Sequence, residues 1–101
     1  MAALYDHNDD GTFKYMLCQY VPPSAKIPDE FTILKVPSLT WVIFPAPNSE
    51  IQDTWRRIYS EWFPTSEYEQ AIGPSFEMYY GYGNEDYSYG VGEIWIPVTK
   101  L

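Results

Sequence analysis

The sequence has few residues of the kinds that bind metals or nucleic acids. It contains one cysteine, Cys18, and one histidine, His7, among 101 residues. These are too few for an internal disulfide or for a zinc or iron–sulfur site. Six Lys and Arg residues stand against 14 Asp and Glu residues, which gives a net charge of −8. Because so acidic a chain repels phosphate backbones, we expect no direct nucleic-acid binding. We also expect no metal and no cofactor.

Long apolar runs are also absent. No stretch reaches the roughly 18 apolar residues that a membrane-spanning helix needs, so we expect no membrane segment. The N-terminus lacks the basic region and apolar run of a signal peptide, and a free Cys18 suits a reducing compartment, so we expect a cytoplasmic protein. Aromatic residues make up 19% of the chain, which excludes a disordered acidic tail. The length predicts a single domain over residues 1–101.

Alternating apolar residues predict a sheet of short strands. Residues 1–11 are interpreted as a mobile or edge segment that ends in a turn. The predicted strands cover residues 12–20, 31–36, 39–44, 75–80 and 87–98. The third of these is apolar almost throughout, which favours a central strand, and we expect Pro45 and Pro47 to end it.

One amphipathic helix is predicted after the third strand. Ser49 and Gln52 have the spacing of a capping box, and an apolar stripe at intervals of three and four residues follows. Pro64 is expected to end the helix. Trp55 and Trp62 lie on the stripe and are interpreted as core residues. The chain therefore reads as α+β, with an antiparallel sheet and one main helix on one face.

Several phrases of the chain together resemble the GyrI-like effector-binding domain, the ligand-binding domain of AraC-type and MerR-type multidrug regulators. The matching phrases are residues 36–37, 40–44, 51–55, 58–66, 76–79 and 93–98, and their order and spacing are shared over about residues 31–100. Residues 5–20 resemble the closing strand of the first repeat of that family.

The resemblance implies two β-α-β-β repeats around a pseudo-twofold, with helices on one side and a ligand cleft between the repeats. This chain matches the second repeat and only the last strand of the first, so we expect a domain truncated at its N-terminal repeat. Either the chain is a fragment or two copies complete the cleft. A free sheet edge and exposed apolar surface favour association, so we expect a homodimer.

Glu93 is the leading candidate for a ligand contact. If Ile94 and its alternate neighbours pack under the helix, Glu93 and Trp95 must point to the opposite face. The resemblance implies that a glutamate at this position pairs with lipophilic cations, and aromatic faces beside a carboxylate favour such a ligand. The alternative interpretation is a solvated glutamate on an exposed sheet face.

Further candidates lie on the neighbouring strands and turn. Glu77 and Tyr79 share one face of residues 75–80, and we expect that face to border Glu93; a structural hydrogen bond is the alternative for Glu77. Trp41 is expected either to form the floor of the cleft or to pack in the core. Four tyrosines around the last turn, at positions 80, 82, 87 and 89, either line the cleft mouth or are ordinary strand residues. The predicted ligand-binding set is Glu93, Trp95, Glu77, Tyr79, Trp41, Tyr82 and Tyr89.

The sequence leaves three functions open. The first is a stand-alone module that binds an amphipathic, cationic or aromatic small molecule, with a possible link to transcription. The second, implied by some relatives, is a hydrolase with Glu93 as general base and Tyr79 as hydrogen-bond donor. The third is an acidic protein that binds a basic partner, as gyrase-inhibiting relatives are thought to do.

Overall fold

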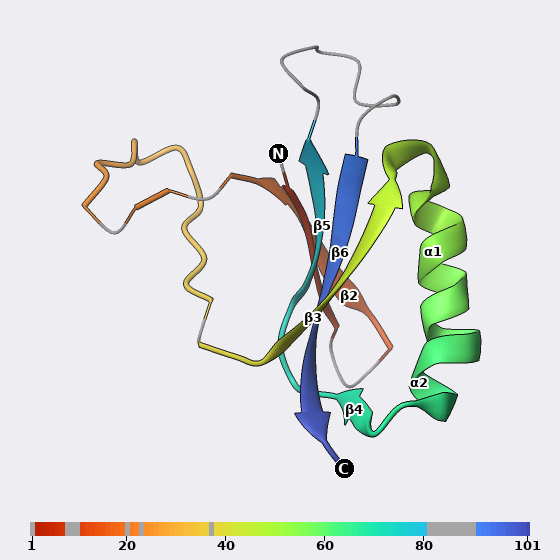
Figure 1. Ribbon diagram of the computed structural model, residues 1–101. Coiled ribbons are helices and arrows are strands. Elements are labelled where there is room, and N and C mark those ends of the chain that lie inside the picture. Colours follow the sequence, from red (N-terminus) through yellow and green to blue (C-terminus); the bar gives the residue numbers. More distant parts are fainter. Residues whose placement is uncertain (1, 8–10, 20, 23, 37, 81–90) are drawn as a thin grey trace.

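The protein is an antiparallel sheet with one helical segment against one face, as the computed structural model shows for residues 2–7, 11–19, 21–22, 24–36, 38–80 and 91–101 (Figure 1). The strands are β1 (Ala2–His7), β2 (Phe13–Cys18), β3 (Trp41–Pro47), β4 (Tyr68–Gln70), β5 (Ser75–Tyr80) and β6 (Val91–Lys100). In the sheet they follow the order β2-β1-β5-β6-β3, and β4 pairs separately with β6. The helical segment is made of η1 (Asn48–Glu50), α1 (Ile51–Arg57), η2 (Ile58–Trp62) and α2 (Phe63–Thr65). This arrangement confirms the predicted α+β fold.

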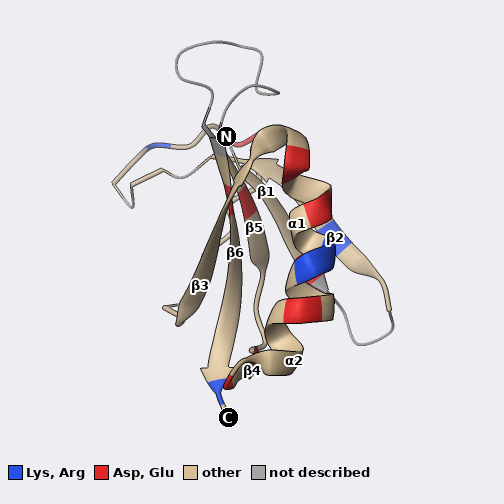
Figure 2. Ribbon diagram, turned by 45° about the vertical axis from the view of Figure 1, so that its right-hand side comes forward, with Lys and Arg blue, Asp and Glu red and all other residues tan. Residues whose placement is uncertain are grey.

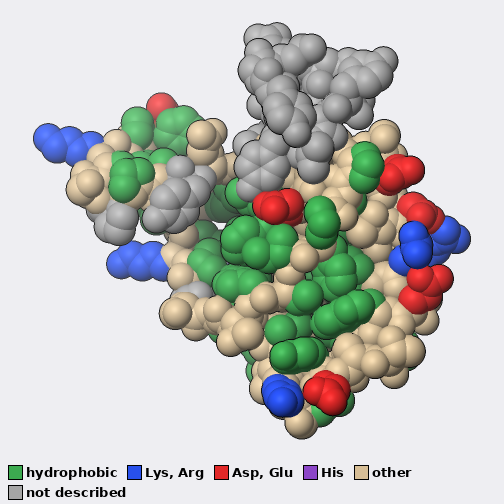
Figure 3. Space-filling model, viewed as in Figure 1, with side chains coloured by type: hydrophobic (Ala, Val, Ile, Leu, Met, Phe, Trp, Pro, Cys, Tyr) green, Lys and Arg blue, Asp and Glu red, His purple; other side chains and the backbone are tan. Residues whose placement is uncertain are grey.

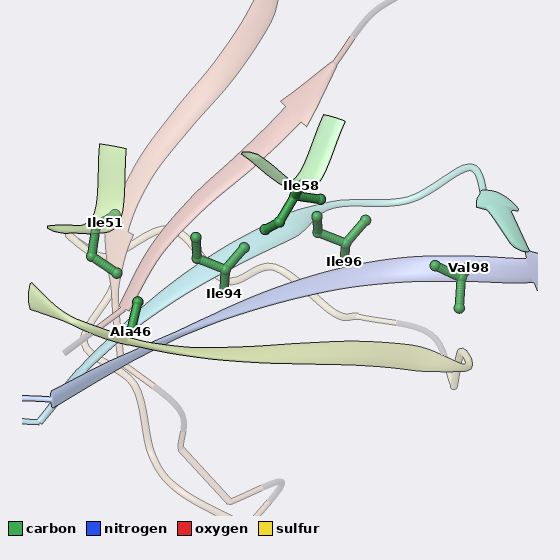
Figure 4. Close-up of a cluster of buried hydrophobic side chains, with 6 residues drawn as sticks. All are labelled: Ala46, Ile51, Ile58, Ile94, Ile96 and Val98. Carbon is green, nitrogen blue, oxygen red and sulfur yellow. The ribbon is translucent and has the colours of Figure 1, made fainter. Parts of the chain in front are cut away.

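The core lies between the helical segment and the sheet. Side chains from β3, the helix and β6 meet there, namely Ala46, Ile51, Ile58, Ile94, Ile96 and Val98 (Figure 4). Ile94 and Ile96 are completely buried. Burial of one such side chain stabilises a fold by about 1.5–3 kcal/mol. The prediction that alternate residues of the last strand face the helix is therefore confirmed, and Glu93 and Trp95 point to the other side of the sheet.

The N-terminal residues were predicted wrongly as a mobile or edge segment. β1 lies inside the sheet, where it pairs antiparallel with β2 on one side and with β5 on the other. Ala2, Ala3 and Leu4 are buried there. The pairing with β5 is long-range, so local sequence patterns do not reveal it. The predicted strand over residues 12–20 is confirmed as β2.

β3 differs from its prediction in both position and end point. It is an outer strand and not a central one, and it continues through Pro45 and Pro47. Prolines cannot donate to a ladder, but in an outer strand alternate residues direct their nitrogen away from the sheet. Because Pro45 and Pro47 are two residues apart, both nitrogens point the same way. Both therefore face the outer edge of β3, where the missing N–H groups cost no hydrogen bond within the sheet.

Residues 31–36 do not form the predicted strand. They are irregular, and their side chains are exposed. The predicted strand over residues 75–80 is confirmed as β5. The last predicted strand is confirmed from Val91 onward, whereas residues 87–90 and the expected turn before them lie outside the described residues.

The helix begins and ends differently from the prediction. It begins at Asn48, and no side-chain capping bond forms at its start, so the proposed capping box of Ser49 and Gln52 is wrong. It also continues past Pro64 to Thr65. A π-helical turn, η2, ends at Trp62, two residues before this proline, and the Phe63 N–H donates to the Ile58 carbonyl. Such a turn widens the helix where a proline ring would otherwise crowd the carbonyl four residues back.

Candidate ligand-binding site around Glu77

The buried carboxylate of Glu77 is the most unusual polar group among the described residues. Glu77 lies in the middle of β5, opposite Ala3 of β1 and Ile94 of β6. Since Ile94 faces the helix, Glu77 faces it as well. Only 2% of Glu77 is exposed. Glutamate is almost never this buried unless a partner compensates the loss of water.

Three neutral donors from three elements satisfy this carboxylate. The Tyr5 hydroxyl of β1 donates to Oε1 at 3.0 Å, and the Tyr79 hydroxyl of β5 donates to the same atom at 2.7 Å. The Trp55 indole N–H of α1 donates to Oε2 at 2.5 Å. An ionised carboxylate only accepts hydrogen bonds, and these three donors suit that form. We call Glu77, Tyr5, Trp55 and Tyr79 the Glu77 cluster.

No basic side chain of the described residues forms an ion pair with Glu77. The ion pairs there join Arg56 to Asp53 and Arg57 to Glu61 on the helix surface. Figure 2 shows these charged positions along the helix. The negative charge of Glu77 is therefore held by neutral dipoles. A cation that reaches the cluster would meet a carboxylate with no competing positive charge.

The tyrosines of the cluster hold their protons tightly. Burial, and then the charge of Glu77 and the hydrogen bond to it, raise the pKa of Tyr5 to about 12. Burial also raises the pKa of Tyr79, again with a hydrogen bond to Glu77 and its charge as further causes. Both phenols are consequently neutral donors at physiological pH.

Aromatic rings extend from the cluster in two directions. Tyr5 contacts Tyr15 and Phe13 of β2, with ring centroids 5.1 and 6.1 Å apart. It also meets Trp55 edge-on at 6.0 Å, and Trp55 in turn stacks with Tyr59 at 6.2 Å. The carboxylate is thus bordered by ring faces and edges. This combination of an anion with aromatic surface attracts organic cations.

On the opposite side of the sheet, three predicted site residues come together. The Trp95 indole N–H donates to Glu93 Oε1 at 3.2 Å. The rings of Trp41 and Trp95 lie 6.0 Å apart, and Trp41 also lies 5.6 Å from Phe76. All of these residues are partly buried. We call Trp41, Phe76, Glu93 and Trp95 the open-face group. Tyr82, Tyr87 and Tyr89 lie outside the described residues.

The expectation that Glu77 and Tyr79 border Glu93 is wrong. Met78 of β5 is the residue opposite Glu93 of β6, so the neighbours of Met78 point to the other face. Glu77 and Tyr79 therefore lie on the helix side, and the sheet separates both from Glu93. This separation also removes the geometric basis for a catalytic pair of Glu93 and Tyr79.

Sequence reasoning missed two members of the Glu77 cluster. Tyr5 was assigned to a mobile segment, and Trp55 was interpreted as a core residue. The apolar run of residues 2–5 before the polar turn was the available signal for a hairpin arm. For Trp55, nothing local indicates that its N–H meets a carboxylate 22 positions further along the chain.

The helix-backed antiparallel sheet thus buries a carboxylate among aromatic rings, with no basic partner within the described residues, and such an arrangement attracts organic cations. The family model Cass2, described as integron-associated effector binding protein, matches residues 1–98. The chain belongs to this family, and its family identifies it as an effector-binding protein. The match confirms the resemblance to GyrI-like effector-binding domains and extends it to the N-terminal hairpin. No curated protein sequence matches the chain significantly.

Two further features are absent from the described residues. Among the described residues, no group of three or more His, Cys, Asp or Glu side chains is arranged to hold a metal ion. None of the helices described is long and apolar enough to cross a membrane.

Proposed function

We propose that this effector-binding protein captures an amphipathic organic cation at the Glu77 cluster. The observation that carries the proposal is the burial of Glu77, which is 2% exposed, is held by three neutral donors and has no basic partner among the residues that the structure describes. Burial without a counter-charge is costly, and a cationic ligand offsets that cost by direct attraction to the carboxylate. The rings of Tyr5 and Trp55 add cation–π attraction and apolar area.

Access to Glu77 requires movement of its donors. Tyr5 and Trp55 are only partly buried, so they lie between solvent and the carboxylate. A ligand enters when one of these side chains turns away and the cation takes over the released carboxylate oxygen. The exchange replaces a neutral hydrogen bond by a charge pair in surroundings with little water, where that pair is strong.

A regulatory role would need a partner. The described residues contain one helical segment, whereas a helix-turn-helix needs two helices. We propose that the protein acts as a ligand-sensing or sequestering module in the cytoplasm, where the free thiol of Cys18 stays reduced. Control of transcription would then pass through a separate DNA-binding protein.

The proposal is tested by calorimetric titration with tetraphenylphosphonium, a lipophilic cation, and with triphenylphosphine oxide, a neutral comparator. We expect the cation to bind and the neutral compound to bind much more weakly. Glu77→Gln should weaken cation binding at least 30-fold, roughly 2 kcal/mol, the lower end for truncation of a buried charge pair. Glu69→Gln, which removes an exposed carboxylate of β4, is the matched control and should leave binding unchanged.

Glu93→Gln separates the two faces of the sheet. If Glu93→Gln removes binding while Glu77→Gln retains it, the ligand lies on the open-face group and the proposed site is wrong. If the wild-type protein binds neither this cation nor other lipophilic cations of similar size, the proposed ligand class is wrong as well.

A further inference from the structure

β2 presents an unpaired edge of the sheet. It is the first strand in the order β2-β1-β5-β6-β3, and within the described residues it pairs with β1 alone. Three of its side chains, Phe13, Tyr15 and Leu17, are each more than half exposed. Natural sheets protect such edges with charges, prolines or bulges. β2 carries a single charged residue, Lys14, and no proline.

A second segment of the same chain has the character of a strand but no strand partner. Residues 31–36 consist of β-branched and apolar side chains apart from Lys35, yet they lie outside the sheet. Phe31, Ile33, Leu34 and Val36 are exposed, with Ile33 at 63%. Within the described residues, positions 32–36 form no backbone hydrogen bond with another segment. Exposed apolar side chains and unpaired backbone groups together favour addition to a sheet edge.

The chain cannot bring this segment to its own β2. Trp41 is fixed in β3, at the far side of the sheet, and five residue steps separate it from Val36. Five extended residues span at most about 18 Å. Measured along the sheet, a strand beyond β2 would lie five strand spacings from β3, which is about 24 Å. The outer edge of β3 is within reach, but Pro45 and Pro47 provide no donors there.

We propose that residues 31–36 of one copy add as a strand to the outer edge of β2 in a second copy, and that the second copy reciprocates. This exchange gives a closed twofold dimer and covers both unpaired edges. The apolar side chains of the segment then pack beside the exposed stripe of β2. This stripe adjoins Tyr5, so the partner strand also borders the Glu77 cluster.

The charge distribution permits this contact despite a net charge of −8 on each copy. β2 and residues 31–36 contain no acidic residue and one lysine each, Lys14 and Lys35. The helix, in contrast, carries Glu50, Asp53 and Glu61 (Figure 2). On the face seen in Figure 3, which has β3 in front and β2 behind, hydrophobic side chains gather over the sheet and on the projecting loop, and most charged groups lie toward the edges of the view.

Sedimentation equilibrium of the complete chain tests the proposal. The wild-type protein should show twice the 11.8 kDa mass of one copy. Leu17→Lys on β2 and Ile33→Lys in the segment should each shift the mass to that of one copy. Ile72→Lys is the matched control, because Ile72 is fully exposed and belongs to neither strand. It should leave the dimer intact, and circular dichroism should show that all three variants keep the wild-type fold.

A mixture of the two disrupted variants distinguishes strand exchange from other contacts. In a mixed pair, the intact segment of Leu17→Lys can still add to the intact β2 of Ile33→Lys, so part of the doubled mass should return. Pairing of β2 with β2 would leave Ile33→Lys dimeric, which would overturn the proposal. A wild-type protein that stays a single copy at every concentration, or a mixture that never associates, would also overturn it.

Discussion

Met78 and Glu93 lie directly opposite each other on β5 and β6. This one register relation assigns the two glutamates of the paired strands to different sides of the sheet, Glu93 to the open face and Glu77 to the helix side. Glu77 thereby becomes a buried carboxylate among three donors, while Glu93 keeps partial exposure and the indole of Trp95. A shift of one residue in β5 relative to β6 would move Glu77 to the open face beside Glu93.

Removal of one donor from Glu77 should lower stability. We expect Tyr5→Phe to reduce the free energy of unfolding by about 1.5–3 kcal/mol, the range for hydrogen bonds to charged groups. The ring and its contacts with Trp55 and Tyr15 remain, so the loss reports the hydroxyl alone. Urea unfolding measures the effect. Tyr15→Phe, a change in an exposed tyrosine of the neighbouring strand, is the control and should be nearly neutral.

Stability should fall at alkaline pH because the folded protein holds the Tyr5 proton more tightly than the unfolded chain does. The pKa of Tyr5 rises from 10.0 to about 12 on folding. The resulting stabilisation is complete below pH 10 and is lost as the pH rises toward 12. The pKa of Tyr79 is raised as well, so it contributes with the same sign.

Unfolding free energies measured from pH 8 upward in about half-unit steps test this dependence. The free energy of unfolding of Tyr5→Phe should decline less steeply above pH 10 than that of the wild-type protein, since the variant lacks one of the two phenols of the Glu77 cluster. Parallel declines for the two proteins would show that Tyr5 does not couple to folding in this range.

Parts of the fold that depend on local patterns were predictable from the sequence. The alternation around Ile94 and Ile96 gave the inward face of β6, and the apolar stripe gave the helix. Parts that depend on long-range pairing were not predictable. The outer position of β3 explains its prolines, yet only the strand order reveals that position.

The candidate site shows the same division. The period of two predicted that Glu93 and Trp95 share a face, and Trp41 joins them there. The face of Glu77 relative to Glu93 depends on the register between β5 and β6, and no single-strand pattern contains it. Tyr5 and Trp55 were not predicted as site residues, because their partner Glu77 lies 72 and 22 positions away in the sequence, respectively.

The packing of β6 against the helix should account for a large part of the stability. Ile94 is completely buried and points from β6 toward the helical residues Ile51 and Ile58 (Figure 4). We expect Ile94→Ala to lower the free energy of unfolding by about 2–5 kcal/mol, because a cavity remains where the side chain was. Ile72→Ala, which shortens a fully exposed isoleucine, should change stability little. Similar losses for both variants in chemical unfolding would contradict the assigned core.

Glu77→Gln should lower the pKa values of both cluster tyrosines without restoring them fully. Two of the three largest causes of the raised Tyr5 pKa are the charge of Glu77 and the hydrogen bond to it, and the variant removes that charge. Burial is the largest cause, and it persists in the variant. The Tyr5 pKa should therefore fall below about 12 and yet stay above 10.0. Nuclear magnetic resonance of ¹³C-labelled tyrosine rings follows each phenol separately, and Glu69→Gln serves as the control. If the two variants titrate alike, the charge of Glu77 has no influence on its donors, and the electrostatic basis of the cation site fails with it.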